Sequence, residues 1–140
     1  MRKSRRRNDQ VYLAFRYEKL IRKKIKEYYN DPPDGRSSSG HLIDNPTMAE
    51  AMHRAIGMST VKINEKESLD YPERWMKVVD RTYHWCDKYH LDVARQYYAG
   101  VPWMRTCMNL NISNTTRRNL LAEVEQRALL YAVQEQLISL

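Results

Sequence analysis

Apolar residues recur along most of the chain at intervals of three or four positions, the spacing of one face of an α-helix. This pattern predicts one helix over residues 9–29, which a pair of prolines ends. Further helices are expected over 46–56, from Tyr71 to about Tyr89, over Leu91–Ala99, over Trp103–Leu110 and from Ser113 onward. Apolar and polar residues alternate over 60–64, but a lone strand has no partner, so we interpret this segment as an extended connector.

These elements predict an all-α protein divided by one Ser- and Gly-rich linker. A basic N-terminal helix is expected within residues 1–34, the linker at 35–45 and a helical domain over 46–140. The predicted fold is thus a helical bundle with a C-terminal helix-turn-helix at about 102–122 and a separate basic N-terminal helix.

Charge changes this picture because it is unevenly distributed along the 140 residues, whose net charge is +7. Residues 1–29 contain 11 basic and three acidic residues, whereas the rest of the chain contains 13 and 14. A second basic region lies between Val93 and Ala122, where four arginines occur without any acidic residue. Such clusters favour an anionic partner.

Several classes of protein are not expected from this sequence. The longest uncharged apolar run, 128–133, has six residues, whereas a membrane span needs roughly 18. The basic N-terminus leads into no apolar segment of the kind found in secretory signals, and two cysteines make no disulfide framework. We therefore expect a cytosolic protein without membrane contact.

Catalytic chemistry has little support in the sequence. There is no Gly-rich phosphate loop and no Cys-x-x-Cys motif. His84, Cys86 and His90 lie close in sequence, but residues 84 and 86 of one helix point about 200° apart and are poorly placed to share a metal. We expect no enzyme activity, no metal and no cofactor.

The most informative segment surrounds Asn111 and Ile112, where one short helix ends and another begins. Ser113 is a favourable N-cap residue for the second helix. This is the layout of a helix-turn-helix, whose second helix enters the DNA major groove with its N-terminus first.

Helical spacing assigns roles to the residues of the second helix. Because Leu120, Leu121 and Val124 must face the core, the residues expected to point outward and contact bases are Asn114, Thr115 and Arg118. The residues expected to contact phosphates are Ser113, Thr116, Arg117 and Arg105. Arg117 lies at the core edge, so a local polar contact is an alternative role for it.

The basic N-terminal helix has several interpretations. It can bind DNA phosphates without sequence preference, through Arg5, Arg6, Arg7, Arg22, Lys23 and Lys26. Its apolar stripe can pack on a second copy and form a homo-oligomer. It can also be a solvated basic face over the core, an RNA-binding surface or, as the last interpretation, a helix on a membrane surface.

The stretch from Ile112 to Glu125 resembles the recognition helix of phage-encoded RinA/ArpU-type late transcription regulators, which are similar to the promoter-binding region 4 of sigma factors. The resemblance extends to the linker over 35–41, to the segments 45–47 and 71–75, and to the tyrosine-rich 95–98. It implies activation of phage late, packaging or lysis genes. It also implies a protein of the bacterial host cytoplasm that is associated with the nucleoid. The chain departs from the usual helix-turn-helix pattern at Arg117, where a small or apolar residue is common.

We therefore expect a sequence-specific DNA-binding regulator, an activator of phage late or packaging genes that binds double-stranded promoter DNA and acts with host RNA polymerase. Two different functions also fit the sequence. One is a DNA-packaging recognition protein that resembles a small terminase subunit and assembles into a ring. The second is a module that binds RNA polymerase or a sigma factor without contacting DNA.

Overall fold

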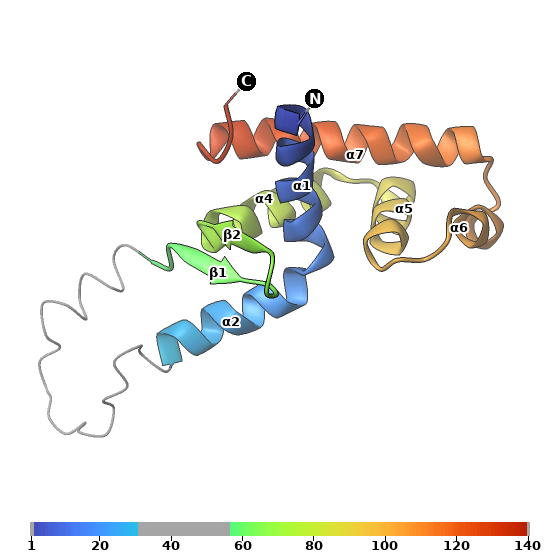
Figure 1. The fold of residues 1–140 in the computed structure, drawn as a ribbon. Helices are drawn as coiled ribbons and strands as arrows, with labels where there is room; N and C mark the ends of the chain where they lie inside the picture. The colour runs from blue at the N-terminus through green and yellow to red at the C-terminus, as the bar shows by residue number, and fades with distance from the viewer. Residues whose placement is uncertain (1, 31–56, 140) are drawn as a thin grey trace, which may run out of the picture. The chain divides into compact units, whose positions relative to one another are not determined.

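The computed structural model describes residues 2–30 and 57–139, and for residues 2–8 it describes the backbone alone (Figure 1). The helices are α1 (Arg2–Arg16), α2 (Glu18–Asn30), α4 (Pro72–Trp85), α5 (Lys88–Tyr98), α6 (Trp103–Leu110) and α7 (Asn114–Gln134). Two short strands accompany them, β1 (Thr60–Lys62) and β2 (Ser68–Asp70). The predicted all-α class is confirmed. The linker at 35–45 and the helix expected over 46–56 lie outside the described residues.

The chain divides into two compact units, which are described separately. Unit 1 consists of residues 1–16 and 74–140, and unit 2 of residues 17–73. Within residues 2–30 and 57–139, no helix combines the length and the apolar character that a membrane span requires.

Unit 1 is built around α7, which α1 and α5 both contact (Figure 1). Val124, Ala128 and Ala132 follow one another at intervals of four residues and are fully buried, so a single stripe of α7 faces the core. The other buried side chains of unit 1 include Val11, Ala14 and Phe15 of α1, Val78 and Val79 of α4, and Val93 and Ala94 of α5.

The single helix predicted over residues 9–29 is wrong, because Tyr17 forms a turn between α1 and α2. The apolar periodicity continues through this turn, but its two halves serve different cores. Val11 and Phe15 are buried in unit 1, whereas Ile21 is buried in unit 2. The first half is therefore an integral part of unit 1, where a separate N-terminal helix was expected.

The C-terminal end of α1 is attached to α5 by a hydrogen bond. Nη1 of Arg16 donates to the carbonyl oxygen of Tyr98 at 2.7 Å. A helix leaves its last carbonyl groups without partners, and a basic side chain satisfies one of them here.

Unit 2 contains a hairpin, so the extended connector predicted over 60–64 is wrong. β1 and β2 pair antiparallel, with Val61 opposite Leu69, and both side chains are 1% exposed. The turn is stabilised by Asn64, whose Oδ1 accepts hydrogen bonds from the backbone N–H groups of Lys66 and Glu67, each at 2.9 Å.

A carboxylate joins three segments of unit 2. Glu73 accepts hydrogen bonds from the Tyr29 hydroxyl, at 3.0 and 2.9 Å, and from the backbone N–H of Met58, at 2.9 Å. Burial and the hydrogen bond to Glu73 raise the pKa of Tyr29 to about 12. Gly57 precedes this contact with a φ of +83°, a conformation that favours glycine.

The helix predicted from Tyr71 to about Tyr89 ends earlier, at Trp85, and the next helix begins at Lys88 rather than Leu91. Asp87 causes this difference. Its Oδ1 accepts a hydrogen bond of 3.0 Å from the backbone N–H of His90, which makes Asp87 the N-cap of α5.

Candidate nucleic-acid interface

The predicted pair of short and long helices is confirmed: α6 spans Trp103–Leu110 and α7 begins at Asn114. Between them Asn111 adopts the left-handed conformation, with φ 56° and ψ 51°, and its N–H donates to the carbonyl oxygen of Cys107. Ile112 donates to the same oxygen at 3.1 Å. Asn accepts this backbone conformation more readily than most residues, so the turn is sharp and locally encoded.

Ser113 is the N-cap of α7, as the sequence predicts. Its Oγ accepts a hydrogen bond of 3.1 Å from the backbone N–H of Thr116 and donates one of 3.1 Å to Oγ1 of Thr116. Two residues assigned to phosphate contact are thus bonded to each other at an exposed helix N-terminus. The remaining N–H groups of the first turn have no partner within the helix and point along its axis toward the solvent.

The base-contact candidates differ in their exposure. Thr115 and Arg118 are exposed on the first turns of α7, whereas Asn114 is only half-exposed. Oδ1 of Asn114 accepts a hydrogen bond of 2.9 Å from Nε of Arg117. Pairing with adenine uses both the oxygen and the amide of Asn, so in such a contact Oδ1 would be shared between Arg117 and the base.

Arg117 therefore makes the local polar contact that was one of its two predicted roles. The residue is half-buried, and its charge acts on Tyr97 of α5. Burial raises the pKa of the Tyr97 phenol, and the guanidinium of Arg117 opposes this rise. The hydrogen bond to Asn114 gives Arg117 a polar partner at a position that is often apolar in helix-turn-helix units.

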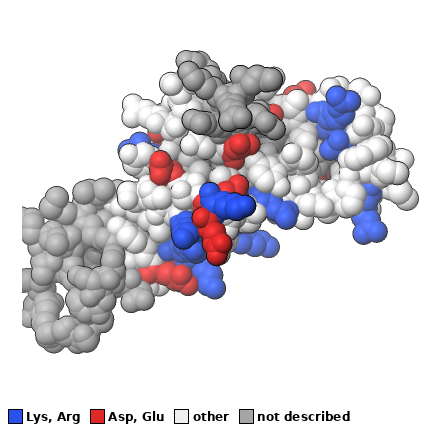
Figure 2. Space-filling model, in the orientation of Figure 1, with Lys and Arg blue, Asp and Glu red and all other residues white. Residues whose placement is uncertain are grey.

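The electrostatic surroundings of this helix start are basic. Arg105 is exposed on α6, and the first acidic residue of α7 is Glu123. In Figure 2 the end of unit 1 formed by α6 and the start of α7 is mostly white with Lys and Arg side chains among the uncharged ones. No carboxylate of residues 93–122 opposes the approach of a phosphate.

The residues assigned to non-specific electrostatic binding are found in both units. Arg22, Lys23 and Lys26 lie on α2, where Figure 2 shows blue side chains interleaved with red ones. Arg22 is paired with Glu18 at 3.0 Å, so part of its charge is compensated, whereas Lys23 and Lys26 are exposed. Arg5, Arg6 and Arg7 lie on the first turns of α1, and their side chains lie outside the described part of the chain.

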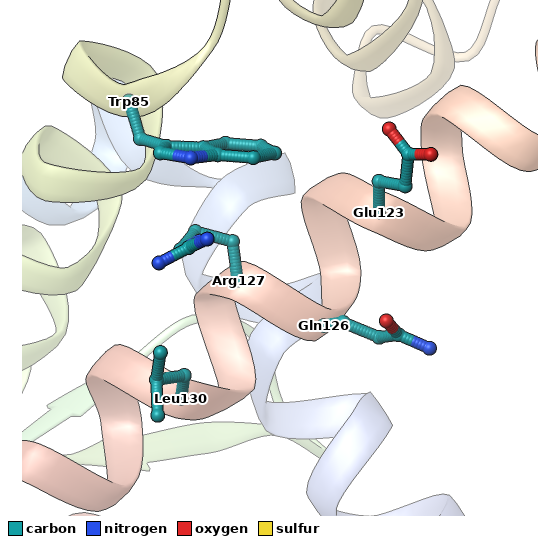
Figure 3. Close-up of a pocket in the computed structure, with 5 residues that line it drawn as sticks. All are labelled: Trp85, Glu123, Gln126, Arg127 and Leu130. Atoms are coloured by element: carbon teal, nitrogen blue, oxygen red, sulfur yellow. The ribbon is translucent and has the colours of Figure 1, made fainter.

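A pocket of about 300 Å³ lies on the other side of α7 and is lined by Trp85, Glu123, Gln126, Arg127 and Leu130 (Figure 3). The guanidinium of Arg127 stacks on the Trp85 ring at 4.6 Å. Glu123 contacts His90 of α5, with Oε1 2.6 Å from Nε2. Arg127 thus joins α7 to α4, and Glu123 joins α7 to α5. Because these charged side chains already have partners, we assign the pocket to packing rather than to ligand binding.

The sequence prediction missed one feature of α6. Trp103, Met104 and Met108 are 49%, 59% and 81% exposed, although the sequence places them in a helix of the bundle. No signal in the sequence could have found it, because α6 contains a single charged residue, Arg105, and the apolar residues of such a helix are normally assigned to the core.

In the ranges that the structure describes, no group of three or more His, Cys, Asp or Glu side chains is arranged to hold a metal ion. The chain matches no known family model, no curated protein and no solved structure.

Proposed function

We propose that the protein is a sequence-specific DNA-binding protein that regulates transcription, with α6 and α7 as its DNA-binding unit. The observation that carries this proposal is the start of α7, where a capped and exposed N-terminus presents Thr115 and Arg118 in an acid-free region. A helix of this kind fits the DNA major groove, and its dipole favours phosphate at its N-terminus.

Arg118 is the residue best suited to base recognition in this unit. Its side chain is exposed, and the described part of the chain offers it neither an ion pair nor a hydrogen bond. A guanidinium can donate two parallel hydrogen bonds to guanine. Thr115, one turn earlier, can contact a thymine methyl or accept a hydrogen bond.

The resemblance to RinA/ArpU-type regulators adds a biological setting to this proposal. It supports promoters of phage late or packaging genes as targets and host RNA polymerase as the partner in activation. The exposed lysines of α2, Lys23 and Lys26, supply affinity without sequence information.

The test is selection of double-stranded oligonucleotides by the full chain, followed by sequencing and affinity measurements at fixed salt. We expect an enriched motif, and Arg118→Ala should lose about 1–3 kcal/mol on that motif and relax the preference at one position. Lys23→Ala should weaken all sequences alike and reduce the salt dependence by about one phosphate contact. A selection without an enriched motif, or an Arg118→Ala variant that keeps the full preference, would contradict the proposal.

A further inference from the structure

Three large apolar side chains are exposed on α6, and we call them the α6 face: Trp103, Met104 and Met108. At about 100° per residue they lie within an arc of about 140°. The half-buried Cys107 lies inside this arc, whereas the buried Thr106 lies on the opposite side of the helix. α6 contacts α5 and α7 (Figure 1). Its exposed apolar side chains lie on the side away from the buried Thr106.

Such a surface is unusual for a helix at the surface of a water-soluble bundle. The solvent side of an amphipathic helix normally carries charged residues, and an exposed apolar patch marks a contact site. Met108 is the most exposed large apolar residue in the described part of the chain, at 81%. Its neighbours on the α6 face are about half-exposed, so the patch combines three side chains rather than one stray residue.

We propose that the α6 face binds an acidic amphipathic helix of a partner protein. Trp is a frequent anchor of protein interfaces, and Met side chains adapt to the shape of an apolar stripe. A partner helix with apolar residues at i and i+4 would fit a two-turn helix such as α6.

The positive charge beside the α6 face favours a partner with negative charge. Arg105 follows Met108 around the helix and is exposed, and residues 93–122 contain no acidic residue. Carboxylates at the edge of the partner's apolar stripe would face Arg105. A basic partner would meet the same charge without any compensating acid.

Two other occupants fit the α6 face less well. In a two-fold pairing of α6 with a second copy, the Arg105 side chains of both copies would lie in one interface without a carboxylate from this region. DNA would meet thioether and indole groups that cannot match its phosphates, whereas the start of α7 offers polar groups. The small size of the α6 face predicts a weak and reversible complex.

The experiment uses the full chain with ¹³C-labelled Met methyl groups and a synthetic helical peptide that carries leucines on one side and glutamates on the other. Addition of this peptide should shift the methyl signals of Met104 and Met108 and the indole signal of Trp103. The double substitution Met104→Ser and Met108→Ser should weaken binding about tenfold or more, which corresponds to the loss of an interface anchor.

A matched control is Leu130→Ser, which removes another exposed apolar residue, 44% exposed on α7. This variant should bind the peptide as the wild type does. Arg105→Glu should weaken binding of the glutamate peptide and strengthen binding of an otherwise identical peptide that carries lysines. Circular dichroism of each variant should show unchanged helix content, because the substituted side chains are exposed.

This proposal does not depend on DNA binding. Arg118→Ala distinguishes the two proposals, because it should weaken DNA binding and leave peptide binding unchanged. The proposal is overturned by absent methyl shifts, or by a Met104→Ser and Met108→Ser variant that binds as tightly as the Leu130→Ser control. It is also overturned if the methyl shifts follow protein concentration without peptide, which indicates a second copy, or if selected DNA alone produces them.

Discussion

Nε of Arg117 donates a 2.9 Å hydrogen bond to Oδ1 of Asn114, three residues earlier on α7. The bond connects one residue expected to contact bases with one expected to contact phosphates. Of the three residues expected to contact bases, Thr115 and Arg118 keep exposed side chains outside this bonded pair. Asn114 and Arg117 hold the first turn of α7 in shape.

This bond should be measurable as a coupling. Asn114→Ala and Arg117→Ala should each destabilise the protein by about 1 kcal/mol, the usual net contribution of a hydrogen bond. Because both remove the same contact, the double variant should cost less than the sum of the two. Urea denaturation of the three variants provides the cycle, and strict additivity would show that the contact contributes nothing in solution.

The N-cap of α7 makes a second prediction. Ser113→Ala removes the acceptor of the Thr116 N–H and should lower the free energy of unfolding by about 0.5–2 kcal/mol. Ser113→Asp keeps an acceptor and should retain most of the stability. Thr115→Ala, at the exposed position two residues later, is the control and should change stability by less than about 0.5 kcal/mol. Equal losses in Ser113→Ala and Thr115→Ala would exclude the cap as the cause.

Glu125 predicts a pH dependence. Burial raises the pKa of this carboxyl in the folded state, so folding favours its protonated form. The resulting penalty is complete above the folded pKa and disappears as the pH falls below the unfolded value. Glu125→Gln should therefore stabilise the protein at neutral pH, by at most about 1 kcal/mol because the side chain is only half-buried and solvent screens its charge.

Thermal unfolding of wild type and Glu125→Gln as a function of pH checks this prediction, with Glu65→Gln on an exposed turn as control. The advantage of Glu125→Gln should shrink toward acidic pH, and the control should show no advantage at any pH. A constant gain over the whole pH range would assign the effect to packing instead.

Gly57 predicts the sharpest response in unit 2. A Cβ at this position would lie 2.5 Å from Oε1 of Glu73, and the φ of +83° disfavours any L-residue. Gly57→Ala should therefore destabilise unit 2 by at least about 1–2 kcal/mol. Hydrogen exchange of the hairpin amides measures the stability of unit 2 directly. The neighbouring exposed Ser59→Ala is the control, and equal exchange in both variants would be incompatible with the strain.

The candidate site could be predicted because its signals are local. The helix end at Leu110, the turn at Asn111 and the cap at Ser113 each depend on residues within one turn of the chain. The hairpin could not be found in this way, because β2 is short and has one buried residue, Leu69. Only the pairing of Leu69 with Val61 of β1 identifies this segment as a strand. The break at Tyr17 depends on two cores that periodicity does not distinguish.

The exposure of the α6 face lies between these cases. Apolar residues of a short helix are normally assigned to the core. α6 contains a single charged residue, Arg105, so its sequence predicts burial for most of its surface. Only the position of α6 at the end of unit 1 shows that two neighbours leave one side open. The Asn114–Arg117 bond belongs to the same class, because periodicity places Arg117 at the core edge without identifying its partner.

The packing of α1 against α7 has a consequence for the order in which the protein is made. The ribosome delivers residues 2–16 long before α7, the helix that α1 contacts and that begins at Asn114. At roughly 5–20 residues per second, α1 waits about 5–20 s for this partner helix. All residues of unit 2 are made within this interval. We therefore expect the hairpin of unit 2 to form on the nascent chain before α1 packs against α7.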